Sequence, residues 1–184
     1  MENKSMRRVF FALWPDQSKQ KEIWSAFTSS SVFFSHKSAL QKSKLYSTDN
    51  LHLTLHFLGN VTDEVLNCVL TEAADVTAKS FTLDLNTYGS FYKARVLWMS
   101  PEVVPAELTG LYDSLSTALK SCGMKVDDRK YNPHVSLVRK LNFKLPPEKT
   151  HSLTWDVKRF ALVESVPIPG GVIYKPVKIY NLTK

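Results

Sequence analysis

The spacing of apolar residues divides the chain into segments of two different periods. Alternating or continuous apolar runs predict strands at 8–13, 51–58, 81–88, 95–100, 133–139, 153–164 and 173–181. Apolar residues three and four apart predict helices from Asp16 to about residue 27, from Thr62 to about residue 79, and over 105–121. Asp16 and Thr62 suit N-caps, and Gly123 suits the end of the third helix. Gly89 predicts the turn of a hairpin.

The order of these segments predicts the fold class. Helices lie between strands in both halves of the chain, which is typical of an α+β protein made of two related lobes. No Gly/Ser-rich or Pro-rich linker separates the halves. We therefore expect residues 1–184 to form one domain of two intimately packed lobes.

Two of the predicted strands carry the same short motif. The first copy reads HLTL from His52, and the second reads HVSL from His134. Because residues two apart share a face of a strand, each imidazole should lie beside a hydroxyl, that of Thr54 or Ser136. The aliphatic residues, together with Phe57, should point to the opposite, buried face. A histidine in one strand is commonly structural, but this repeated unit is rarely expected by chance.

Two such pairs suit the cleavage of a phosphodiester without a metal ion. That reaction needs a base to activate the attacking oxygen and an acid to protonate the leaving oxygen, and imidazoles can do both near neutral pH. The hydroxyls of Thr54 and Ser136 can donate hydrogen bonds to non-bridging phosphate oxygens. The pattern therefore predicts an acid–base pair, His52 and His134, across a groove.

Charge, cysteine content and hydropathy indicate which partners and which cellular compartment to expect. The chain has 24 Lys and Arg against 17 Asp and Glu, a net charge of +7, which favours anionic partners such as nucleic acid. Cys68 and Cys122 are too few for a disulfide framework, so we expect reduced packing residues. No apolar run approaches the length of a membrane span, and a cytoplasmic protein without membrane contact is expected.

With these motifs the sequence resembles the 2H phosphoesterase superfamily, and most of all its LigT-like branch of RNA 2′,3′-cyclic phosphodiesterases and 2′-5′ RNA ligases. Further similarity lies at 8–13, 49–51, 95–98, 129–133, Glu164, Ser165 and Tyr174. The resemblance implies a bilobal α+β fold with pseudo-twofold symmetry, antiparallel-sheet lobes, outer helices and a central cleft. It also implies hydrolysis of a 2′,3′-cyclic phosphate to a 2′-phosphomonoester, with no metal or cofactor.

The resemblance assigns residues to the site as well. It makes His52 the proton donor and His134 the proton acceptor, with Thr54 and Ser136 on the phosphate. Three further residues are expected to bind substrate: Arg139, Tyr46 and Phe10. Strand parity alone points Arg139 away from the cleft, and a surface position is the alternative reading. Phe10 is equally compatible with a place in the core.

Because side chains alternate along a strand, His56 is expected on the same face as His52, so it could reach the cleft. Four residues along a strand span about 13 Å, which is too far for His52 and His56 to share one metal ion. We expect His56 to be peripheral rather than catalytic.

Two rival functions remain open at this point. The same residues would serve a 2′-5′ RNA ligase or 2′-5′ phosphodiesterase, and a nucleotide- or RNA-binding module without turnover is the alternative outside the enzymes. In each case the expected partner is RNA or a nucleotide, for the enzyme one with a 2′,3′-cyclic phosphate, and we expect a monomer.

Overall fold

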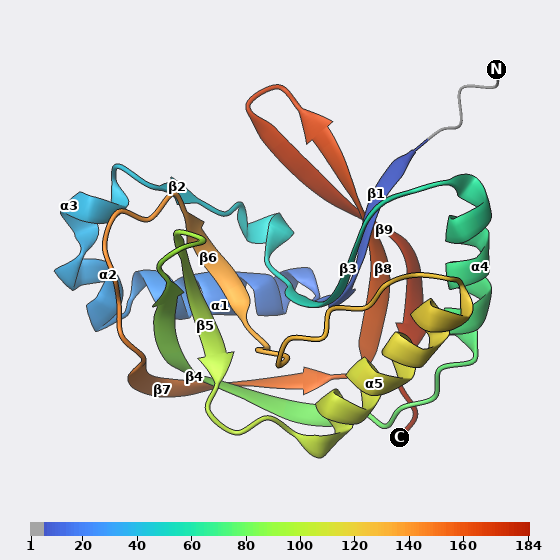
Figure 1. Ribbon diagram of the computed structural model, residues 1–184. Helices are drawn as coiled ribbons and strands as arrows, with labels where there is room; N and C mark the ends of the chain where they lie inside the picture. Colours follow the sequence, from blue (N-terminus) through green and yellow to red (C-terminus); the bar gives the residue numbers. More distant parts are fainter. Residues whose placement is uncertain (1–5) are drawn as a thin grey trace.

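The computed structural model describes residues 6–184, which form one antiparallel sheet flanked by helices (Figure 1). Its nine strands are β1 (Arg7–Leu13), β2 (Lys44–Leu45), β3 (Leu53–Val61), β4 (Phe81–Phe91), β5 (Val96–Pro101), β6 (Val135–Arg139), β7 (Glu148–Val157), β8 (Arg159–Ile168) and β9 (Gly171–Asn181). The helices are α1 (Gln17–Thr28), α2 (Ser31–Ser35), α3 (Lys37–Leu40), α4 (Asp63–Ala74), α5 (Ala106–Ser121) and the 3₁₀ turn η1 (Thr48–Asn50).

The order of strands divides the sheet into two halves. Along the sheet it runs β7-β4-β5-β6-β3-β1-β8-β9, with the short β2 paired to β6. The halves meet where β6 pairs with β3, and a single residue pair, Leu53 with Val135, joins them. We call this junction the seam. The predicted α+β fold with two antiparallel-sheet lobes is confirmed, and the two strands at the seam are those that carry the repeated motif.

Helices lie beside both lobes. In Figure 1, α1 to α3 lie beside β4 to β7, whereas α4 and α5 lie next to each other beside β1, β3, β8 and β9. The predicted caps are present: the side chains of Asp16 and Thr62 accept hydrogen bonds from the backbone N–H groups of Lys19 and Val65. The second long helix ends at Ala74, five residues earlier than predicted.

Two predicted strand boundaries were wrong. The run 153–164 is two strands, β7 and β8, separated at Lys158. The β4–β5 hairpin turns at 92–95 rather than at Gly89, which lies inside β4 and pairs with Trp98. Gly89 is needed there for a close approach, because a Cβ atom at this position would lie 2.4 Å from two ring carbons of Trp98.

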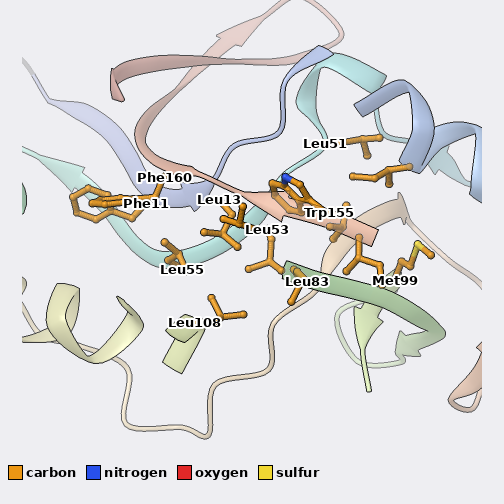
Figure 2. Packing of buried hydrophobic residues seen from close by; sticks show 14 of the residues in the cluster. Phe11, Leu13, Leu51, Leu53, Leu55, Leu83, Met99, Leu108, Trp155 and Phe160 are labelled. Atoms are coloured by element: carbon orange, nitrogen blue, oxygen red, sulfur yellow. The ribbon is translucent and has the colours of Figure 1, made fainter. Parts of the chain in front are cut away.

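A shared hydrophobic core joins the sheet to its helices (Figure 2). Leu53 and Leu55 of β3 point into it, and Leu108 of α5 packs with them in the same cluster. Phe11 of β1 and Phe160 of β8 add aromatic packing, with ring centroids 6.1 Å apart. Because the core covers one face of the seam strands, their polar side chains are left on the other face.

The expectation of reduced cysteines was wrong. Cys68 of α4 and Cys122, the C-cap residue of α5, form a disulfide with Cα atoms 5.8 Å apart. The two residues are 54 positions apart in sequence, and only the packing of α4 against α5 brings them together.

Candidate active site at the seam

The register at the seam brings the two motifs together. In an antiparallel pair the neighbours of a paired residue lie opposite each other, so His52 lies across from Ser136 and Thr54 across from His134. All four side chains are only partly buried, whereas the aliphatic residues between them are inaccessible. Two imidazoles and two hydroxyls therefore share the open face of the sheet, as parity predicts.

Each imidazole is held by the same local contact. Nδ1 of His52 lies 2.6 Å from the carbonyl oxygen of Asn50, and Nδ1 of His134 lies 2.7 Å from that of Asn132. A carbonyl oxygen can only accept, so Nδ1 carries the proton and Nε2 is the unprotonated nitrogen in both rings. Nε2 of His52 lies 3.1 Å from the hydroxyl oxygen of Thr54. Both histidines follow an asparagine by two positions in the sequence, and this shared spacing indicates the contact.

An aromatic ring supports each imidazole as well. Phe10 contacts His52 and Phe91 contacts His134, both with ring centroids 4.8 Å apart. Phe10 is 3% exposed and also packs against Tyr174 of β9, so it belongs chiefly to the support of His52. Phe91 was not among the predicted site residues, because nothing in the pattern of β4 sets it apart from core.

Because of a bulge in β3, the predicted faces of His56 and Phe57 were wrong. Pairing with β1 skips Leu55, since Ala12 pairs with Thr54 and Phe11 with His56. An extra residue reverses the alternation beyond it. His56 therefore turns inward to 5% exposure, and Phe57, which parity had buried, is 58% exposed and faces the cleft.

His56 is held by α5 in its buried position. Its ring stacks on Tyr112 at 4.0 Å, and Nε2 lies 2.9 Å from the Tyr112 carbonyl oxygen and 3.1 Å from the Ser116 hydroxyl. Burial lowers the pKa of His56. A neutral imidazole bonded to the backbone of α5 fits the expected peripheral place.

A matching bulge in β6 explains how Arg139 reaches the cleft. Pairing with β5 skips Leu137, since Trp98 pairs with Ser136 and Leu97 with Val138. Arg139 consequently turns to the same side as Ser136 and lines the same cavity. The alternation of side chains pointed Arg139 away from the cleft, and the bulge is the reason that this expectation was wrong.

A cavity of about 600 Å³ opens over the seam on the His52 side. Six of the seven predicted site residues line it: Phe10, Tyr46, His52, Thr54, Ser136 and Arg139. The β8–β9 hairpin, which stands out at the top of Figure 1, contributes Tyr174 to its wall. His134, the seventh, lines a second cavity that shares Thr54 with the first.

Each of the two arginines that line the first cavity, Arg8 and Arg139, lies over an aromatic ring. The Arg139 guanidinium lies 4.5 Å from the centre of the Tyr46 ring, and Arg8 lies 4.9 Å from that of Phe57. Cation–π contacts of this kind hold an arginine in place while its charge remains available. Burial raises the pKa of the Tyr46 hydroxyl above its ordinary value.

Burial sets the charge state of the two seam histidines. It lowers the pKa of His52 to about 4, and the neighbouring His134 adds to this effect. Burial also lowers the pKa of His134. Both rings are therefore neutral near pH 7 without a ligand. A phosphate anion between them would favour imidazolium and raise both pKa values.

Within residues 6–184, no group of three or more His, Cys, Asp or Glu side chains is arranged to hold a metal ion. Over the same residues, no helix is long and apolar enough to cross a membrane.

Trp98 supports the His134 side of the site. Its indole lies over Gly89, with its ring centroid 5.4 Å from that of Phe91, and Phe91 in turn contacts His134 in a T-shaped arrangement. The indole Nε1 is buried and has no hydrogen-bond partner among the described residues. Packing over Gly89, rather than a polar contact, therefore holds this ring in place.

We expect Gly89→Ala to destabilise the protein by about 1–3 kcal/mol, because the new methyl group would overlap Trp98 and overpack the site. Urea unfolding measures the change. Gly110→Ala is the matched control, since a Cβ atom there meets nothing within 4 Å and alanine favours the helix α5. Unchanged stability of Gly89→Ala would contradict the packing described.

Comparison with known proteins agrees with this geometry. A family model described as the 2′-5′ RNA ligase superfamily matches residues 15–166. The RNA 2′,3′-cyclic phosphodiesterase of Escherichia coli K12 is 30% identical over 75% of this chain and 79% of its own. That of Archaeoglobus fulgidus is 27% identical over 95% of this chain and 99% of its own.

Solved structures show the same fold. The crystal structure of E. coli LigT complexed with 3′-AMP superposes with a TM-score of 0.84 at 27% identity, covering 98% of this chain and all of that one. The match by the family model extends over most of the chain, including both copies of the histidine motif. The chain therefore belongs to the 2′-5′ RNA ligase superfamily.

Proposed function

We propose that this protein hydrolyses 2′,3′-cyclic phosphate ends of RNA to 2′-phosphomonoesters. The observation that carries the proposal is the pair of imidazoles at the seam, each anchored through Nδ1 and each facing a hydroxyl across it. Within the described part of the chain, this arrangement leaves Nε2 of both rings unprotonated and without a backbone partner, with only the Thr54 hydroxyl beside that of His52. Both atoms are therefore available for proton transfer, as a base and an acid acting on one phosphate require.

In the proposed reaction His134, in its neutral form, accepts a proton from the attacking water. The new bond forms between the water oxygen and phosphorus, and the bond from phosphorus to the 3′ oxygen breaks. Protonated His52 donates its proton to that leaving oxygen. The anionic substrate makes this possible, because it raises the lowered pKa of His52 on binding.

The hydroxyls and the arginine are assigned to the phosphate. Thr54 and Ser136 lie next to the imidazoles and can donate to the non-bridging oxygens. Arg139 lines the same cavity and adds a fixed positive charge. Tyr46 and Tyr174 are proposed to contact the nucleoside, and Phe10 to position His52.

The relatives support this choice of substrate. Several of them carry the name RNA 2′,3′-cyclic phosphodiesterase, and one related structure holds 3′-AMP.

All the groups proposed for the reaction come from one chain, so a monomer would suffice for activity. We propose a cytoplasmic setting, in which the Cys68–Cys122 disulfide would be unusual, because thiols are kept reduced there.

The test is the product formed from an RNA oligonucleotide that ends in a 2′,3′-cyclic phosphate. We expect a terminal 2′-phosphate, with undiminished turnover in the presence of a chelator. A 3′-phosphate would show that the 2′ oxygen leaves instead, and no turnover would overturn the proposal. Supplying a second RNA with a free 5′-hydroxyl end tests for ligation. In that reaction the 5′-hydroxyl replaces water as the attacking group, the 3′ oxygen leaves and a 2′-5′ linkage forms through the same residues.

A further inference from the structure

A second cavity of about 620 Å³ adjoins the first on the His134 side of the seam. Thr54 and Phe57 belong to the walls of both cavities, so a phosphate at the seam would lie at their border. The hydrolysis proposed above needs the seam and room for one nucleoside. One of the two cavities is therefore not accounted for by a mononucleotide.

The rim of the second cavity is strongly basic. Lys93 comes from the β4–β5 turn, and Lys125, Arg129 and Lys130 come from the segment between α5 and β6. All four side chains are exposed. Asp127 neutralises Arg129 through hydrogen bonds of 2.9 and 3.0 Å from Nε. Across residues 6–184 the three lysines have no carboxylate partner, so their charges remain available to an anion.

Aromatic rings line the inside of the same cavity. Tyr112 and Tyr131 stack at 4.1 Å, and the Tyr131 hydroxyl donates to the Thr54 carbonyl oxygen at 3.1 Å. Phe91 and the exposed Phe57 complete this lining beside the seam. Flat apolar rings beside free cations are the combination that binds single-stranded nucleic acid, with bases on the rings and phosphates on the cations.

We infer that the second cavity is a subsite for the RNA strand that precedes the cyclic end, with its phosphates on Lys93, Lys125 and Lys130 and a base against Phe57 and Phe91. The inference rests on the proposed function, because it places the terminal nucleotide in the first cavity. It adds a preference for polymer over mononucleotide, since only a polymer occupies both cavities.

Turnover of two substrates tests the inference: 2′,3′-cyclic AMP and a short RNA oligonucleotide with the same cyclic end. The variant replaces the three rim lysines with glutamine. A control variant removes the same charge from exposed lysines that line neither cavity. The substitutions are Lys93→Gln, Lys125→Gln and Lys130→Gln in the first, and Lys42→Gln, Lys144→Gln and Lys178→Gln in the second.

We expect the rim variant to raise KM for the oligonucleotide several-fold and to leave turnover of 2′,3′-cyclic AMP unchanged. The dependence of log(kcat/KM) on log[salt] for the single-stranded oligonucleotide should become shallower by roughly 0.7 unit for each lysine that contacts a phosphate. The control variant should behave like the wild-type protein with both substrates.

Two outcomes would overturn the subsite while leaving the proposed function intact. In one, the rim variant hydrolyses both substrates like the wild type. In the other, the control variant loses as much oligonucleotide turnover as the rim variant, which would indicate attraction by overall charge. If the wild-type protein hydrolysed neither of the two substrates, the proposed function would be contradicted instead.

Discussion

Replacing His52 or His134 with glutamine should lower kcat for a 2′,3′-cyclic phosphate by roughly 10²–10⁴-fold in each case, the usual contribution of one general acid or base. Glutamine retains a polar side chain of similar size, so the fold and the seam should persist. Rates are measured in single turnover with excess enzyme, and urea unfolding reports any loss of stability.

His151→Gln is the control for this pair. His151 is exposed on β7 and lines neither cavity, so its replacement removes an imidazole without touching the seam. It should leave kcat unchanged. Normal turnover by either seam variant would mean that the corresponding imidazole transfers no proton.

Thr54→Val and Ser136→Ala should each lower kcat by roughly 10²–10³-fold, as does the loss of one preorganised donor to a developing oxyanion. Valine keeps the shape of threonine, and alanine keeps the backbone of β6. The loss should appear in kcat more than in KM, because the donated bonds strengthen as charge builds on the phosphate oxygens.

The matched control for Thr54→Val is Thr154→Val, at an exposed position of β7 outside the cavities over the seam. It should turn over like the wild type. If Thr54→Val raised KM and left kcat unaltered, the hydroxyl would contribute to binding only, and its assignment to the transition state would be wrong.

Strand periodicity correctly predicted the part of the site closest to the histidines. His52 with Thr54 and His134 with Ser136 share faces because both pairs precede any irregularity in their strands. Beyond Leu55 and Leu137 the same rule failed for His56, Phe57 and Arg139. Both bulges appear only in the pairing with a neighbouring strand, β1 or β5, so periodicity within one strand does not reveal them.

Other features required the tertiary structure for a similar reason. The Cys68–Cys122 disulfide depends on how α4 packs against α5, over 54 intervening positions. Phe91 is a site residue only because β4 lies two strands from β6. By contrast, the paired Asn50 and Asn132 could have been found by extending the comparison of the two motifs two residues upstream.

The lowered pKa values of His52 and His134 change the pH optimum that the sequence predicts. Unperturbed histidines would place the optimum of an acid–base pair near neutral pH. Burial lowers the pKa of His52 to about 4 and also lowers that of His134, so both limbs of the kcat/KM profile should move to the acid side of 6.5. The kcat profile reports the enzyme–substrate complex, in which the anion raises both pKa values, and should lie at higher pH.

The pH dependence of kcat/KM for the wild type, His52→Gln and His134→Gln tests the central claim most directly. The wild-type rate should fall on both sides of an optimum, since one imidazole must be protonated and the other neutral. His52→Gln should lose the alkaline limb, and His134→Gln the acid limb. If both variants kept both limbs, the two histidines would not be the acid and the base, and the proposed mechanism would be wrong.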